Sequence, residues 1–175
     1  MAVATTSACA ARSPVNDSGS SRNTATQSVG PVEATTEASC PLDAQTLSEI
    51  AGRDLVAGSS SSHECDFHTS DPNGFFAIRL GYVAEDDPAA LEAGKGALAT
   101  LSRMREIYGG SGGCSAEDEP SLGGGAFLAS CQLGGATSGF ELNSVIWTVV
   151  IDGAAGKAAD VRVCRDVSSR IRQSV

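Results

Sequence analysis

Residues 140–151 read FELNSVIWTVVI, and this run of β-branched and aromatic residues decides the fold that we expect. Apolar side chains alternate along the run, as they do in a strand that packs one face against a core. Their parity changes at Asn143 and Ser144, which predicts a β-bulge within one long strand. Ile146 and Val150 lie on the opposite face, so we expect a central strand that is covered on both sides.

Shorter strands are expected around this one. Residues 64–69 and 75–83 flank the turn sequence DPNG at 71–74, which predicts a hairpin. The alternating apolar positions of its second strand are Phe76, Ile78, Leu80 and Tyr82. Residues 126–133 predict another strand, with Phe127, Cys131 and Leu133 on one face, ahead of a turn at 134–139. Residues 58–62 and 114–124 are expected to be loops.

Three segments have helical signals. Asp43 is a good N-cap and Gly52 a good stop for a short first helix. A second helix is expected to start after residues 86–88 and to end in the glycines of 109–113, with the apolar stripe Leu91, Leu98, Leu101, Met104 and Tyr108. The stripe of the last helix is Ala158, Val161, Cys164, Ser168 and Ile171. No strand–helix–strand repeat requires a parallel sheet, so the order predicts an α+β fold, an antiparallel sheet flanked by helices.

Composition limits the partners. The chain has 175 residues, 41% of them hydrophobic, which is enough for one domain with a core. Its formal net charge of −9 repels phosphate backbones, so we expect no nucleic-acid partner. The same charge gives little attraction to anionic lipids, so attachment to a membrane would have to be covalent.

The N-terminus suggests such an attachment. Residues 6–9 read TSAC, like the end of a lipoprotein signal, and we interpret residues 1–9 as that end, with Cys9 as the lipid anchor and the first half of the signal missing. Residues 10–39 are polar and without periodicity, which predicts a disordered tether before a single globular domain at 40–175. The alternative is a disordered tail that carries a stray cysteine.

Six cysteines in an apparently exported chain predict a disulfide framework. Cys40 precedes the first helix and Cys65 lies on the first predicted strand, so a bridge between them would pin that helix to the sheet. Cys114 and Cys131 bracket the acidic loop and would staple it to the strand that follows.

If Cys9 carries lipid, five cysteines remain and one is left over. Cys164 lies on the apolar stripe of the last helix. It is either a buried free thiol or the partner of Cys131 in an alternative bridge, and the sequence does not choose between the two.

One motif resembles a catalytic one. The sequence GGSGG at 109–113 matches the G-x-S-x-G hydrolase pattern around Ser111. That chemistry requires a strand-to-helix turn and a later histidine, whereas here a helix precedes the motif and His63 and His68 come earlier. We therefore interpret the motif as a helix stop and assign no catalytic residue.

Metal ligands are also not assigned. His63, Cys65 and His68 are close in sequence, but on a strand the two histidines point to opposite faces and Cys65 is better placed for a disulfide. The acidic runs at 85–87 and 117–119 lack the spaced ligands of a calcium loop. The chain also has no glycine-rich phosphate loop or dinucleotide motif, so we expect no metal and no cofactor.

Three short segments, CPLD at 40–43, ECDF at 64–67 and VCRDV at 163–167, resemble an actinobacterial family of secreted lipoproteins of unknown function. The resemblance covers about residues 40–175. It implies a cell-envelope location and a helix-flanked antiparallel sheet like the PsbP-type sandwich. It implies no catalytic residues.

Together these observations predict a monomeric, non-catalytic lipoprotein of the cell envelope that binds a peptide, a lipid or another envelope protein. A small secreted hydrolase that uses Ser111 and a structural accessory subunit are the alternatives. The last of these predicts an exposed apolar patch larger than about 600 Å².

Overall fold

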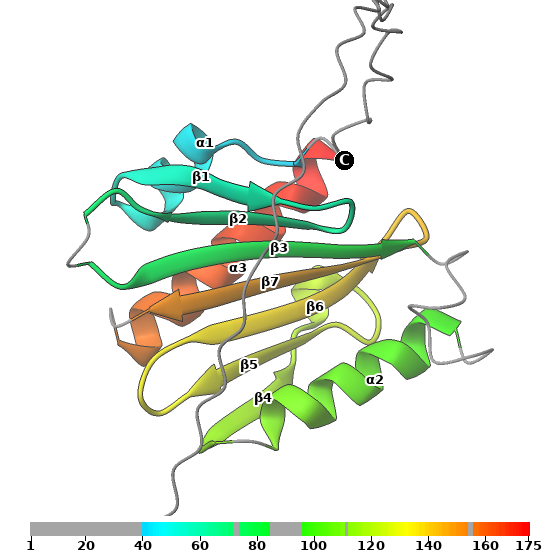
Figure 1. Ribbon diagram of the computed structural model, residues 1–175. Coiled ribbons are helices and arrows are strands. Elements are labelled where there is room, and N and C mark those ends of the chain that lie inside the picture. The colour runs from blue at the N-terminus through cyan, green and yellow to red at the C-terminus, as the bar shows by residue number, and fades with distance from the viewer. Residues whose placement is uncertain (1–39, 72–73, 85–95, 111, 154–155) are drawn as a thin grey trace, which may run out of the picture. The chain divides into compact units, whose positions relative to one another are not determined.

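The computed structural model describes residues 40–71, 74–84, 96–110, 112–153 and 156–175. These residues form a seven-stranded antiparallel sheet flanked by helices, which confirms the predicted α+β fold (Figure 1). The strands are β1 (Leu55–Ser60), β2 (Glu64–Thr69), β3 (Phe76–Ala84), β4 (Cys114–Asp118), β5 (Phe127–Cys131), β6 (Ala136–Leu142) and β7 (Val145–Gly153). Their order in the sheet is β1-β2-β3-β7-β6-β5-β4.

Two helices cover one face of the sheet and a third lies on the other (Figure 1). The helices are α1 (Ala44–Ala51), α2 (Gly96–Gly109) and α3 (Lys157–Ser174), and a 3₁₀ turn, η1 (Pro120–Leu122), follows β4. Helix α3 packs on β5, β6 and β7, α1 packs on β1 and α3, and α2 packs on β4, β5 and β6. The sequence predicted α1 correctly, with Asp43 as its N-cap and Gly52, at a φ of 68°, as its C-cap.

The main core lies between the sheet and the pair α1 and α3. Ile78 and Leu80 of β3 and Val149 of β7 contribute fully buried side chains to this core, and Val167 and Ile171 of α3 complete it. A smaller cluster under α2 includes Leu101, Phe127 and Ile146. The central strands β6 and β7 are therefore covered on both faces, as the sequence of residues 140–151 predicted.

The prediction that residues 140–151 form one bulged strand is wrong. These residues belong to β6 and β7, which form an antiparallel hairpin in which Leu142 pairs with Val145. Asn143 and Ser144 make the turn, with φ angles of 54° and 59°. Positive φ at both central residues is the geometry of the two-residue turns that fit the twist of hairpins. The change of parity at Asn143 and Ser144 marks a reversal of the chain rather than a bulge.

Two strands were missed because they lie at the edges of the sheet. Part of β1 was predicted as the loop 58–62, and all of β4 lies within the predicted loop 114–124. Five of the six residues of β1 are exposed, so its sequence has no alternation to read. Both strands are held by pairing with their inner neighbours, β2 and β5, rather than by their own apolar pattern.

Several predicted apolar faces also differ. Leu133 is 95% exposed in the turn after β5, and Leu98 of α2 is 62% exposed. Helix α3 buries Cys164, Ser168 and Ile171 of its predicted stripe, but Ala158 is exposed, and Val163 and Val167 are buried although they were not predicted to be. The physical reason is that α3 faces the sheet along a line that includes Asp160, which a search for apolar residues does not select. Residues 85–95, with the predicted start of the second helix and Leu91, lie outside the described residues.

The turn between β6 and β7 generates a prediction. Ser144 has a left-handed backbone conformation that costs a residue with a Cβ about 1 kcal/mol or more and costs glycine nothing. We expect Ser144→Gly to raise the free energy of unfolding by up to about 1 kcal/mol, measured by urea denaturation, because the relief of left-handed strain exceeds the extra backbone entropy that glycine loses on folding. In the control Ser115→Gly, in β4, the same change should lower it by roughly 0.5–1 kcal/mol. A lower unfolding midpoint for Ser144→Gly would contradict the turn geometry.

Candidate binding site

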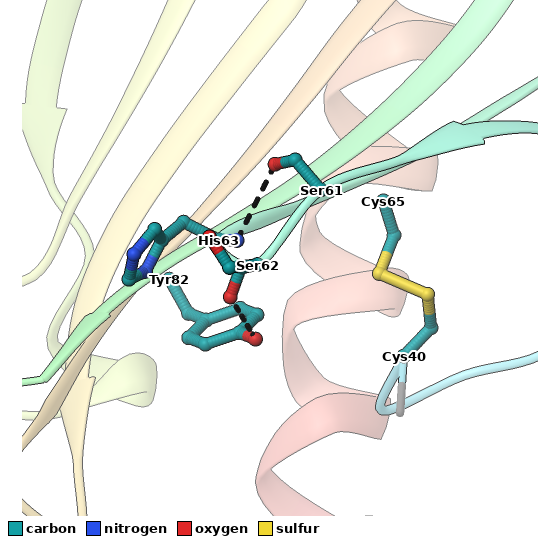
Figure 2. Close-up of a disulfide and its surroundings, with 6 residues drawn as sticks. All are labelled: Cys40, Ser61, Ser62, His63, Cys65 and Tyr82. Carbon is teal, nitrogen blue, oxygen red and sulfur yellow. Dashed lines mark hydrogen bonds between the residues drawn. A yellow bond between two sulfur atoms is a disulfide. The ribbon is translucent and has the colours of Figure 1, made fainter. Parts of the chain in front are cut away.

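The first disulfide joins Cys40 to Cys65, with their Cα atoms 6.1 Å apart. Cys40 precedes α1, and Cys65 is a buried residue on the face of β2 that α1 and α3 cover. Figure 2 shows this bond together with Ser61, Ser62 and His63 of the turn between β1 and β2, and with Tyr82. The bond therefore ties the start of α1 to the end of the sheet at which β1 and β2 are connected.

The second disulfide joins Cys114 to Cys131, which lie directly opposite each other in the ladder of β4 and β5. It attaches the edge strand β4 to its neighbour. The alternative bridge between Cys131 and Cys164 does not form, and Cys164 is a free thiol.

Cys164 lies in the main core with no exposed surface. Its thiol donates to the carbonyl oxygen of Val149 at 3.6 Å, and burial raises its pKa to about 12. Next to it, the hydroxyl oxygens of Ser138 and Ser168 lie 2.6 Å apart, and Ser168 also donates to the carbonyl oxygen of Cys164. This polar cluster satisfies its own hydrogen bonds and is closed to solvent, so we assign it a structural role.

A pocket with a mainly apolar lining opens beside the first disulfide, and we call it the apolar pocket. Its volume is about 260 Å³. It is formed by the segment that leads into α1, by β1 and by β2. The residues that line it are Cys40, Leu42, Asp43, Ala44, Ala57, Gly58, Ser60, Cys65, Asp66 and Phe67.

A β-bulge shapes the mouth of the apolar pocket. Ala57 pairs with Phe67 and Ser60 pairs with Cys65, so Gly58 and Ser59 together stand opposite the single residue Asp66. Regular pairing between β1 and β2 is interrupted here. The pocket is therefore bordered by an irregular segment at the edge of the sheet as well as by the disulfide.

The charged residues that line the apolar pocket are both acidic. Asp43 is exposed and accepts a hydrogen bond from the backbone N–H of Thr46 at 2.8 Å, which lowers its pKa, so it is ionised at neutral pH. Asp66 is half-buried, and one of its carboxylate oxygens lies 3.3 Å from the hydroxyl of Ser59. No lysine or arginine lines the pocket. An apolar interior with an acidic border favours a ligand that carries an apolar group next to positive charge.

Three aromatic rings at the same end of the sheet contact one another in a row. His63 is exposed in the turn before β2 and packs against Tyr82, with ring centroids 5.8 Å apart. Tyr82 packs in turn against Trp147 at 5.4 Å and donates a hydrogen bond to the carbonyl oxygen of Ser62. Figure 2 shows Tyr82 and His63 at this turn. These contacts hold the connection between β1 and β2 in place beside the Cys40–Cys65 bond.

A second pocket of about 200 Å³ lies between β4, β5 and α3. Its carboxylate Glu119 accepts hydrogen bonds from Ser121 at 2.6 Å and from the guanidinium of Arg165 at 2.8 and 2.9 Å. The hydrogen bond from Ser121, followed by that from Arg165, lowers the pKa of Glu119. These partners already use the charge of Glu119 to connect the end of β4 to α3, so this pocket is the weaker candidate.

The other residues singled out by sequence are not brought together. Cys65 is used in the disulfide, His63 lies in the turn and His68 is exposed on β2 on the face opposite Cys65. Within the described ranges no three His, Cys, Asp or Glu side chains converge as metal ligands do. Glu117 and Asp118 belong to β4, where Asp118 forms an ion pair with Arg105 at 2.7 Å. Cys9, Ser111 and the acidic run 85–87 lie outside the described residues.

Helices that are long and apolar enough to cross a bilayer are absent from the part of the chain that the structure describes. Comparison with protein-family models, with curated proteins and with solved structures finds no significant match to this chain. The resemblance to actinobacterial secreted lipoproteins, and to the PsbP-type sandwich, therefore stays a prediction.

Sequence reasoning found the disulfide at the apolar pocket but missed the pocket. Ala57 and Gly58 line it from β1, and that strand was not predicted. The available signal was the short run Leu55-Val56-Ala57 ahead of Gly58, which is too short and too exposed to stand out as a strand.

The Cys40–Cys65 bond should contribute measurable stability. A disulfide that closes a loop of 25 residues restricts the unfolded chain, so removing it should cost about 3 kcal/mol of unfolding free energy. We expect Cys40→Ala, Cys65→Ala and the double variant to lose similar amounts in urea denaturation, because either single change already breaks the bond. Losses that simply add in the double variant would show that the two cysteines act independently.

Cys164 should make stability depend on alkaline pH. Its folded pKa of about 12 lies above its ordinary value of 9.0, so between these pH values the native state holds a proton that the unfolded state releases. This contribution is complete below pH 9.0 and is lost as the pH rises toward 12, by at most about 1.4 kcal/mol per pH unit.

The measurement compares the wild-type chain with Cys164→Ala. From pH 8.5 to 10.5 the unfolding free energy of the wild-type chain should fall relative to that of Cys164→Ala. Parallel pH profiles would contradict the burial of the thiol.

Proposed function

We propose that this chain is a non-catalytic binding module of the cell envelope, exported, held by lipid at Cys9 and related to the actinobacterial lipoproteins that it resembles. The single observation that carries the proposal is the disulfide pairing of Cys40 with Cys65 and of Cys114 with Cys131. Disulfides persist in oxidising compartments outside the cytosol and are rare inside it. Two bonds placed at opposite sides of one sheet suit a domain that works there.

The apolar pocket supports a binding role. It lies beside the Cys40–Cys65 bond, so the bond fixes one wall of the pocket as well as the start of α1. A wall that is rigid before binding loses less conformational entropy when a ligand binds. The charged groups that line the pocket are the carboxylates of Asp43 and Asp66, which recognise a ligand by charge.

Net charge narrows the class of partner. With a formal net charge of −9, the chain repels nucleic acids and anionic lipid head groups. The partners that remain are a peptide, an uncharged or cationic lipid and another protein of the envelope. Attachment to the membrane through lipid on Cys9 is independent of these surface charges.

The test is the intact mass of the protein purified from the membrane of its native host, with and without alkylation before reduction. We expect an acyl-modified N-terminal cysteine at Cys9 and four cysteines that alkylate only after reduction. Cys164 should alkylate only after denaturation, because it is buried. A soluble intracellular chain whose cysteines all alkylate without reduction would overturn the proposal.

A further inference from the structure

We propose that the apolar pocket and the free edge of β1 bind an extended, positively charged peptide segment, which pairs its backbone with β1 and inserts one apolar side chain into the pocket. This rests on the proposed binding function and names its ligand class. Three features of the molecule support it: the unpaired outer side of β1, the volume of the pocket and the acidic residues that line it.

The edge of β1 is open for pairing. Within the described residues β1 pairs with β2 alone, so its outer side has no strand partner; the N–H of Leu55 already donates to the hydroxyl of Ser48 in α1 at 2.9 Å, and the groups left for a peptide begin after it. Its sequence, LVAGSS, contains no charged residue and no proline, which are the devices that most often protect an exposed edge. An extended peptide adds to such an edge through backbone hydrogen bonds, and neighbouring pockets select its side chains.

The bulge limits how long the peptide strand is. Regular pairing of β1 covers Leu55 to Ala57 and is interrupted at Gly58 and Ser59. A bulge at an edge blocks long edge-to-edge association. The remaining segment suits a few residues of a peptide, and the pocket opens where that segment ends, at Ala57 and Gly58.

The size of the pocket selects one side chain. Its volume of about 260 Å³ exceeds the roughly 150 Å³ of a cavity that holds benzene. It falls below the roughly 300–1,000 Å³ of sites that enclose a drug-sized molecule. One Leu or Phe side chain fits with room left over, whereas a drug-sized molecule or a whole cofactor does not.

Charge complementarity selects the flanking residues. Asp43 and Asp66 are the charged residues that line the pocket; Asp66 stands opposite Arg79 in the ladder of β2 and β3, which offsets part of its charge, so Asp43 contributes most of the negative field. Lys or Arg beside the apolar residue of the peptide meets this negative field, and an acidic peptide is repelled. The absence of a cation among the residues that line the pocket also disfavours an anionic lipid head group.

The experiment uses the full-length oxidised chain and a fluorescent probe, the peptide acetyl-Lys-Thr-Lys-Phe-Lys-Thr-Lys-amide, in an anisotropy titration. We expect saturable binding. A probe with Ala in place of Phe should bind about tenfold or more weakly, because it leaves the pocket empty, and a probe with Glu in place of Lys should not bind. Vesicles of anionic phospholipid should not compete with the probe.

Protein variants locate the site. Ala57→Trp fills the pocket from an exposed position on β1 and should weaken binding about tenfold or more. The matched control Ser115→Trp, at an exposed position on the opposite edge strand β4, should leave it unchanged. Asp43→Asn keeps the N-cap of α1 but removes its charge, so it should weaken binding several-fold and reduce the salt dependence even if Ala57→Trp fails to fold.

Three results would overturn the inference. They are binding of the acidic probe as well as the basic one, equal affinity for the Phe and Ala probes, or a chain that sediments as a dimer joined through β1. Each of them leaves the proposed function intact if the membrane-derived protein carries lipid and oxidised cysteines. Reduced cysteines in a cytosolic chain would instead remove the proposed function, whatever the probe does.

Discussion

The ladder between β3 and β7 is the interaction on which the rest of the structure depends. Nine residue pairs, from Phe76 opposite Gly153 to Ala84 opposite Val145, join the two halves of the chain. One half contains α1, β1, β2 and β3, and the other contains α2, β4 to β7 and α3. Ile78 and Leu80 bury their side chains next to Ile151 and Val149 along this ladder, so the main core exists only when the two halves have paired.

The inner strands β2 and β3 could be predicted from the sequence because apolar and polar side chains alternate along them. Along β3, Phe76, Ile78 and Leu80 point to one face and are buried, as predicted, and the whole of β2 was predicted with its bounds. Alternation is strong where one or both faces of a strand are buried. It cannot distinguish a bulge from a tight turn, because both change the parity, and this is why the hairpin at Asn143 and Ser144 was interpreted as a bulge.

The edge strands could not be predicted from the sequence, and the candidate site lies at one of them, β1. An edge strand has one neighbour and one exposed row of backbone groups, so its residues are selected less by the core than those of inner strands. The apolar pocket is made of such residues, Ala57 and Gly58 of β1, together with Cys40 and the start of α1. In the sequence only Cys40 and Cys65 pointed to this site, because a disulfide between distant segments can be predicted without any periodic pattern of side chains.

The two edges of the sheet differ in a way that separates their roles. At β4, Glu117 and Asp118 place charges on the edge strand, Asp118 pairs with Arg105 of α2, and the Cys114–Cys131 bond fixes the strand to β5. Charged side chains at an edge oppose the addition of another strand. At β1 the edge has no charge, and the disulfide is made by Cys65 of the neighbouring strand β2, so it braces the site without occupying the edge. The β-bulge at Gly58 and Ser59 interrupts the β1 edge instead, so the two edges are protected by different devices, and the short segment before the bulge is the part of the edge that the proposed peptide would use.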